Sequence, residues 1–217
     1  MAFTVHAVMP GVWHIVDCMG VCMTLLEGEN AAMLVDTGYG IEDVADFMRH
    51  MTDLPLTVFL THNHHDHAMG ARCFPETYML ESDIADWRMF TNDEMRRRVL
   101  TQAIGKNLPV DEKTFLAGEI PLPKVMKPGV IDLGGLTAEI IEAPGHTPGS
   151  AVVYVPERKL LLSGDDWNPC TWLFFPQALG LREYRSNMRG IQQLPFEKVL
   201  CPHREALYDR WMCDDFF

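Results

Sequence analysis

The chain has 217 residues, 47% of them hydrophobic, which is enough apolar material for the core of one compact domain. Thirty acidic against 18 basic residues give a formal net charge of -12, which repels phosphate backbones and anionic lipid and argues against nucleic-acid and membrane partners. The pattern of a secretion signal is missing, and no run approaches the roughly 20 apolar residues of a membrane span, so we expect a cytoplasmic protein.

The six cysteines are scattered along the chain without a C-x-x-C pair. We therefore expect them to be small buried hydrophobic residues in a reducing cytoplasm. They are Cys18, Cys22, Cys73, Cys170, Cys201 and Cys213.

The first part of the chain predicts an antiparallel meander followed by a helix and a buried strand. The runs FTVHAV, VWHIV, VCMTLLE and AAMLVD are strand-like and are separated by turns. After Asp36-Thr37-Gly38, apolar residues recur at helical spacing between Ile41 and Met51. The short continuous apolar run LTVFLT at 56–61 then predicts a strand that is covered on both faces.

A second set of strands begins near Val130. VIDL, TAEIIEAPG, SAVVYVP and KLLLSGD are strand-like, the segment 181–194 has helical periodicity, and KVLCPH is a last strand. AAMLVDTG and KLLLSGDD are similar to each other, which weakly suggests two related halves.

The segment 82–129 differs from both halves. Ser82 can cap one helix, and Thr91-Asn92-Asp93-Glu94 has the form of a capping box for a second helix that ends at Gly105. The remainder is rich in proline and glycine and predicts a loop. We expect a helical insertion in a single domain, acting as a lid over a site, with extra packing as the alternative.

The stretch THNHHDH at 61–67 places four histidines and an aspartate directly after a buried strand. On an extended backbone His62 and His64 point the same way, and Asp66 and His67 follow where the chain turns. Neutral imidazoles with a carboxylate suit zinc, iron or manganese better than calcium or magnesium. The stretch therefore predicts the start of two neighbouring metal sites.

Three further ligand-type residues also follow apolar strands. His146 lies in the loop EAPGHTPGS, Asp165 ends LLLSGD, and His203 ends KVLCPH. Because strand ends can meet at one edge of a fold, we expect these side chains to complete the metal sites.

The order H-x-H-x-D-H, PGHTPGS, SGD and PH resembles the metallo-β-lactamase-fold hydrolase superfamily, over most of the chain from Asp36 to His203. The resemblance implies a four-layer αββα sandwich of two mixed β-sheets. It also implies a dinuclear centre: His62, His64 and His146 would hold one metal, Asp66, His67 and His203 the other, and Asp165 would bridge them. Asp36 would support the site from behind, and His65 occupies a variable position to which we assign no ligand role.

Two such metals, with zinc favoured over iron or manganese, can share a water and lower its pKa toward 7, which supplies a hydroxide nucleophile. Asp66 or Asp165 would receive or relay the proton. The aspartate at 165, where class B1 and B2 lactamases carry a cysteine, favours relatives that cleave esters, thioesters and lactones of small molecules. Glyoxalase II-like thioesterases add a glutathione-binding helical region after the last ligand, whereas fourteen residues follow His203 here, so we do not expect glutathione thioesters.

Two groups of residues are candidates for a substrate pocket. Aromatic side chains of the segment DWNPCTWLFFP can wall an apolar pocket or pack under a loop; they are Trp167, Trp172, Phe174 and Phe175. Arg182, Tyr184 and Arg185 can meet a substrate carboxylate or form a solvated helix face, and the second role is favoured.

Other functions remain open from the sequence. Persulfide dioxygenases of the same superfamily hold a single iron by two histidines and an aspartate, but a full set of seven ligands favours the dinuclear hydrolase. A nuclease is disfavoured by the net charge of -12, and a non-catalytic scaffold by the complete ligand set.

Overall fold

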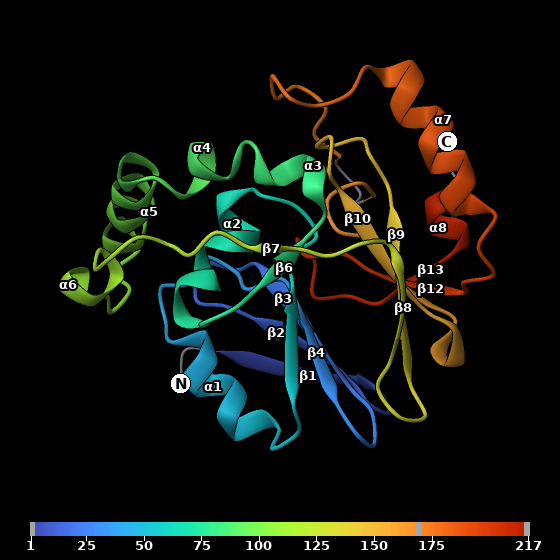
Figure 1. Ribbon diagram of the computed structural model, residues 1–217, viewed down its shortest axis with the longest axis horizontal. Helices are drawn as coiled ribbons and strands as arrows, with labels where there is room; N and C mark the ends of the chain where they lie inside the picture. Colours follow the sequence, from blue (N-terminus) through green and yellow to red (C-terminus); the bar gives the residue numbers. More distant parts are fainter. Residues whose placement is uncertain (1–2, 168–170, 215–217) are drawn as a thin grey trace.

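Two β-sheets pack face to face, with helices on both outer faces (Figure 1). The computed structural model describes residues 3–167 and 171–214. The four-layer αββα sandwich expected from the motifs is confirmed. Within the described ranges, none of the helices has the length and apolar character needed to span a membrane.

The first sheet has seven strands in chain order. They are β1 (Thr4–Met9), β2 (Val12–Val16), β3 (Cys22–Glu27), β4 (Ala32–Val35), β5 (Leu56–Phe59), β6 (Tyr78–Met79) and β7 (Lys124–Val125). β1 to β4 form the antiparallel meander that was predicted, and β4 to β7 are parallel, so the sheet is mixed.

The second sheet has six strands in the order β13-β12-β11-β10-β9-β8. They are β8 (Gly129–Asp132), β9 (Thr137–Glu142), β10 (Ala151–Val155), β11 (Leu160–Leu162), β12 (Lys198–Leu200) and β13 (Tyr208–Asp209). Only β11 and β12 run parallel. This sheet is therefore also mixed, as expected.

The main core lies between the sheets. Met33, Val35 and Phe59 of the first sheet meet Val153 and Leu162 of the second. Each outer face is covered by an amphipathic helix that buries its apolar side. α1 (Val44–Met51) covers the first sheet and α7 (Leu181–Gln192) covers the second. Two short helices belong to the second half of the chain: η2 (Pro156–Arg158), which follows β10, and α8 (Trp211–Asp214), which follows β13.

Four of the six cysteines can be placed. Cys22 and Cys201 are buried, Cys18 and Cys73 are half-buried, and all four are free thiols. The side chains of Cys170 and Cys213 lie outside the described residues.

The insertion contains four helices, α3 (Glu81–Ile84), α4 (Trp87–Thr91), α5 (Asp93–Gly105) and α6 (Glu112–Phe115). The two helix caps predicted from the sequence were wrong in detail. Ser82 lies inside α3, whose N-cap is Leu80, and Thr91 is the last residue of α4, so that Asn92 caps α5 by accepting from Met95 N at 2.9 Å. The segment predicted as loop contains α6 and β7, both too short to show a period in the sequence.

A buried arginine holds the insertion together. Arg96 is 1% exposed, and its guanidinium donates to the carbonyl oxygens of Phe115, Ala117 and Gly118. It thereby ties α5 to the turn after α6. A cluster that includes Trp87, Val99 and Phe115 gives the insertion a core of its own, packed against Leu60 and Met69 beside the histidine-rich stretch.

Candidate metal centre

Several strands end at one edge of the sandwich, and their following residues form the site. The residues after β4, β5, β9, β11 and β12 are Asp36, the stretch 60–67, His146, Asp165 and His203. The backbone N–H of Ala151 donates to Thr61 O at 2.9 Å and joins the two sheets at this edge. The chain turns into α2 (His65–Ala68) and η1 (Met69–Cys73) directly after His64.

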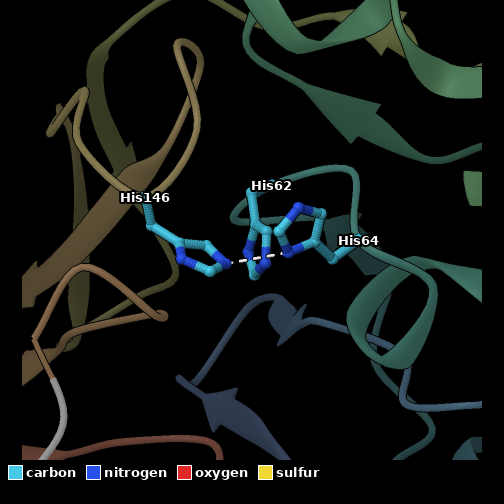
Figure 2. A group of neighbouring side chains, drawn as sticks. All are labelled: His62, His64 and His146. Atoms are coloured by element: carbon cyan, nitrogen blue, oxygen red, sulfur yellow. Dashed lines mark hydrogen bonds between the residues drawn. The ribbon is translucent and has the colours of Figure 1, made fainter. Parts of the chain in front are cut away.

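Three buried histidines form a first cluster. One nitrogen each of His62, His64 and His146 lies within 4.8 Å of the others. Figure 2 shows the three rings turned toward one another, with Nε2 of His146 2.8 Å from Nδ1 of His64. The ligand atoms of the first cluster thus come from both halves of the chain.

A second cluster lies beside the first. Asp66, His67 and His203 bring their ligand atoms within 4.8 Å of one another. Nε2 of His67 and Nε2 of His203 each lie 3.6 Å from Oδ2 of Asp66. His65 belongs to neither of these groups; its ring packs edge-on against Tyr39 instead.

Asp165 lies between the two clusters. Its Oδ2 is 3.5 Å from Nε2 of His146 in the first cluster. The same oxygen is 3.6 Å from Nε2 of His67 and 3.1 Å from Nε2 of His203 in the second. One carboxylate therefore faces ligand atoms of both clusters.

A buried aspartate orients two of the ligands. Asp36 Oδ2 accepts from Nδ1 of His67 at 3.0 Å, and its carboxylate also accepts from the N–H of Thr61 at 2.7 Å and from the Thr61 hydroxyl. Because the Thr61 hydroxyl donates to Asp36, it is an acceptor for Nδ1 of His62 at 3.0 Å. The imidazole of His62 then keeps an unprotonated Nε2 for the site, and the bond to Asp36 fixes the orientation of the His67 ring.

The other two histidines of the first cluster are oriented by the segment after β11. Nδ1 of His146 donates to the carbonyl oxygen of Trp172 at 2.7 Å, which leaves its Nε2 lone pair for the cluster. The side-chain amide of Gln177 lies 3.3 Å from Nε2 of His64, the nitrogen that does not face His146.

Asp36 has a backbone conformation that most side chains avoid. Its φ is +64°, in the left-handed region, where aspartate and asparagine are tolerated better than other non-glycine residues. Backbone strain of this kind is concentrated at functional sites. In this conformation the carboxylate of Asp36 accepts hydrogen bonds from both Thr61 and His67.

The electrostatics separate the two clusters. Burial, followed by the neighbouring histidines, holds the pKa of His62 well below its ordinary value, and burial with His146 lowers the pKa of His64 to about 3. Burial also lowers the pKa of His146, so the first cluster consists of neutral imidazoles. Burial alone would raise the pKa of Asp165, but His67 and His203 hold it well below the ordinary range. Burial alone would lower the pKa of His67, but Asp165 and Asp66 raise it well above the ordinary value, so the second cluster of the metal-free protein pairs an imidazolium with carboxylates.

This donor set fits two transition-metal ions. Nε2 of His62, Nε2 of His67 and Oδ1 of Asp165 are buried without a hydrogen-bond partner. Unsatisfied buried polar atoms are costly, and metal ions held by the two clusters would satisfy all three. Neutral imidazole nitrogens with carboxylate oxygens are ligands of zinc, iron and manganese.

A cavity of about 360 Å³ opens over the centre. Its polar lining includes Tyr39, His65 and Gln102. Its apolar lining comes from two sides of the molecule: Met19, Val21 and Phe90 on one, and Trp172 and Phe175 on the other. The ring centroid of Phe175 lies 4.9 Å from that of His64, so the aromatic wall reaches the first cluster.

Two of the expected pocket aromatics are elsewhere. Trp167 is buried in the cluster under α7, and its ring packs edge-on against Tyr208. Tyr184 belongs to the same cluster, and its hydroxyl donates to the carbonyl oxygen of Asp166. Trp167 thus takes the packing role that was left open for it. Tyr184 takes neither of the roles considered for it, a substrate contact or a solvated helix face, because its side chain is buried against the second sheet. Phe174 is 73% exposed, and its ring is tilted against that of Phe175, with 4.9 Å between the ring centroids.

Arg182 and Arg185 also lie away from the metal centre. They line a separate surface hollow along α7 with Leu181, Ser186 and Arg189. This placement agrees with the solvated helix face that was favoured for them.

Besides His65, six residues of the cavity lining were not predicted as site residues from the sequence: Met19, Gly20, Val21, Tyr39, Phe90 and Gln102. Tyr39 follows the Asp36-Thr37-Gly38 turn, while Phe90 and Gln102 belong to the insertion. Tyr39 lies directly after a motif that was recognised, which is the one feature of the sequence that indicated it. Phe90 and Gln102 reach the cavity only through the packing of α4 and α5.

The comparisons with known proteins agree with this geometry. The model of the metallo-beta-lactamase superfamily matches residues 16–203. A chicken (Gallus gallus) protein, acyl-coenzyme A thioesterase MBLAC2, is 26% identical over 166 residues, which cover 69% of this chain and 59% of that protein. The present chain thus spans less than two thirds of the length of this relative.

Solved structures share the fold at low sequence identity. A metallo-beta-lactamase from Pontibacter korlensis matches with a TM-score of 0.70 at 17% identity, over 99% of this chain and 96% of that one. TTHA1623, solved in a di-iron-bound form, matches with a TM-score of 0.60 at 20% identity, over 95% and 94%. With the family model matching most of its length, and with histidine and aspartate clusters at the shared sheet edge, the chain belongs to the metallo-beta-lactamase superfamily.

Proposed function

We propose that the chain is a dinuclear metal-dependent hydrolase that cleaves an ester, thioester or lactone bond of a small molecule. The observation that carries the proposal is the position of Asp165, whose Oδ2 lies within 3.6 Å of ligand nitrogens from both clusters. A carboxylate in that position offsets the repulsion between two cations and fixes their separation.

We propose zinc as the first candidate for both ions, with iron as the second. The donor set suits either metal, and the structural neighbour TTHA1623 was solved with two irons. When bound, the two ions would lower the pKa of a shared water and polarise the carbonyl that it attacks.

The protein side chains position the reactants and move the proton. Asp66 lines the cavity, and although burial alone would raise its pKa, His67 and His65 hold the pKa below its ordinary value. It is therefore a carboxylate at neutral pH, able to accept a proton from the attacking water and to deliver it to the leaving oxygen or sulfur. Asp165 is the second carboxylate that can accept and deliver this proton.

The cavity favours an apolar acyl group. Trp172 and Phe175 form one wall and Phe90 lies on the insertion side, while the charged groups in the lining are the ligands Asp66 and Asp165. Burying an acyl chain against this wall contributes about 0.8 kcal/mol for each methylene group. The relative named as an acyl-coenzyme A thioesterase supports a thioester among the candidate bonds.

We propose that the insertion acts as a lid over the cavity. Phe90 of α4 and Gln102 of α5 reach the cavity from segments that leave and rejoin the first sheet. A cover of this kind excludes water from the reaction.

The proposal is tested by preparing the protein without metal, reloading it anaerobically with zinc, manganese or ferrous iron, and measuring metal per chain. Hydrolysis of matched ester, thioester and lactone substrates with acyl chains of increasing length is measured in parallel. We expect about two metals per chain and chelator-sensitive hydrolysis that improves with chain length. One firmly bound iron, with oxygen consumed on a persulfide and no hydrolysis, would replace the proposal with an oxidoreductase.

A further inference from the structure

A buried carboxylate of the insertion bonds to both loops that carry the first cluster. Asp83 lies in α3 and is 1% exposed. Its Oδ2 accepts from the N–H of Asn63 at 3.1 Å and from the hydroxyl of Thr147 at 2.7 Å. Its Oδ1 accepts from the N–H of Gly149 at 2.6 Å. The Asn63 side chain donates in return to the carbonyl oxygen of Asp83 at 2.9 Å.

These partners are neighbours of metal ligands in the sequence. Asn63 stands between His62 and His64, and Thr147 follows His146. Each of the three histidines is therefore one residue away from a group that hydrogen bonds to Asp83. Because the two loops come from different sheets, Asp83 is a direct polar link between them at the ligands.

The packing at this link leaves no room for adjustment. A Cβ atom at Gly149 would lie 2.5 Å from the backbone N of Asp83 and 2.6 Å from its Oδ1. Such distances are far below an ordinary contact, so the loop after His146 can approach α3 only through a glycine. The separation between α3 and this loop is thus set closely by residue type.

The cost of burying Asp83 indicates a role other than general stability. Burial raises the pKa of the carboxyl group, and the donors from Thr147, Gly149 and Asn63 offset this only in part. An apolar side chain would avoid that cost, whereas a carboxylate can hold three donors from two loops at fixed distances.

We propose that Asp83 is a positioning residue for the first metal, setting the spacing between the His62/His64 loop and the His146 loop. It also connects the insertion to the metal centre, so that a displacement of α3 would be transmitted to all three histidines. The inference rests on the proposed function in one respect, that the three-histidine cluster holds a metal.

The test uses metal affinity and does not depend on turnover. Cobalt(II) is titrated into the metal-free protein, and its absorption spectrum reports the ligands at each step. The titration is repeated in variants that also carry His203→Ala, which removes a candidate ligand of the second cluster. The cobalt binding that remains then reports the affinity of the three-histidine cluster. Urea unfolding of each metal-free variant records whether it is folded.

We expect Asp83→Asn to weaken cobalt binding at the three-histidine cluster by about 10- to 100-fold, the usual range for residues that orient metal ligands. Thr91→Val is the matched control. It removes a buried hydroxyl whose hydrogen bond, to Trp87 O at 2.8 Å, stays within α4, and it should leave cobalt affinity unchanged. A folded Asp83→Asn variant with wild-type cobalt affinity would overturn the inference.

A second pair of variants decides the question if Asp83→Asn does not fold. Thr147→Ser keeps the hydroxyl that donates to Asp83, and Thr147→Val removes it. We expect Thr147→Ser to bind cobalt like the wild type and Thr147→Val to bind several-fold more weakly, and equal affinities for the two would also overturn the inference. A wild-type protein that binds no metal would instead contradict the proposed function.

Discussion

Asp36 accepts a hydrogen bond from Nδ1 of His67 at 3.0 Å and, through the Thr61 hydroxyl, also orients His62. A single carboxylate behind the site therefore orients one candidate ligand from each of the two clusters. Its left-handed backbone conformation, with φ of +64°, brings it beneath both rings.

Asp36→Asn tests this relationship with little change to the backbone, since asparagine also tolerates the left-handed region. An amide cannot accept from Thr61 and His67 in the way that a carboxylate does, so we expect metal affinity to fall by about 10- to 100-fold. Metal retained after dialysis against a chelator series is the measurement. Asp46→Asn on exposed α1 is the control and should match the wild type; equal retention by Asp36→Asn would contradict the role of Asp36.

The buried histidines predict how the metal-free protein responds to acid. The pKa of His64 is lowered from an ordinary 6.5 to about 3, chiefly by burial, so between these values the unfolded chain binds a proton at this site and the folded chain does not. Folding therefore loses stability as the pH falls from about 6.5 toward 3, by up to about 1.4 kcal/mol per pH unit for this group.

The check is the urea midpoint of the metal-free protein at pH values between 7 and 5. We expect His64→Gln to show a shallower pH dependence than the wild type and His50→Gln, on the exposed face of α1, to show the same slope as the wild type. A His64→Gln slope equal to that of the wild type would show that His64 does not contribute.

Removing part of the aromatic wall is expected to weaken the preference for longer acyl chains. Trp172→Ala removes cavity lining, while the backbone carbonyl that accepts from His146 stays in place. We expect kcat/KM for a medium-chain acyl ester to fall by about 10-fold relative to an acetyl ester, in line with the loss of roughly one or two buried methylene contacts. Trp211→Ala, at an exposed position on α8, is the control. An equal loss on both esters would argue against acyl recognition by this wall.

The hydrogen bonds of Arg96 are expected to stabilise the insertion. Arg96→Ala leaves the carbonyl oxygens of Phe115, Ala117 and Gly118 without this donor in a buried region. We expect a loss of about 2–4 kcal/mol in the free energy of unfolding, measured by urea titration. Arg98→Ala, which removes an exposed pair with Glu94, should cost less than about 0.5 kcal/mol. Similar effects of the two variants would contradict the structural role of Arg96.

The meander, the long helices and the residues of the two clusters could be predicted because each leaves a pattern in the chain. Strand-like runs separated by turns mark β1 to β4, helical periodicity marks α1 and α7, and the cluster residues follow apolar strands that end at one edge. Two-residue strands such as β6 and β13 and four-residue helices such as α3 are too short to show any period.

Other features depend on tertiary packing and could not be read from the sequence. Trp167 and Trp172 are five residues apart in one aromatic segment, yet Trp167 is buried under α7 and Trp172 lines the cavity. Asp83 is one residue from Ser82, which has the usual character of a helix cap, but only the fold shows that its carboxylate reaches Asn63 and Thr147.

We propose that Asp165 would bridge the two metals, and the metal content of Asp165→Ala is the sharpest test of this role. After dialysis against a weak chelator, the wild type and His65→Ala, which changes a residue outside both clusters, should hold about two metal ions per chain. We expect Asp165→Ala to lose metal from both clusters, because the carboxylate within 3.6 Å of each is gone. An Asp165→Ala protein that keeps two metals, or a His65→Ala protein that loses them, would rule out the bridging role of Asp165.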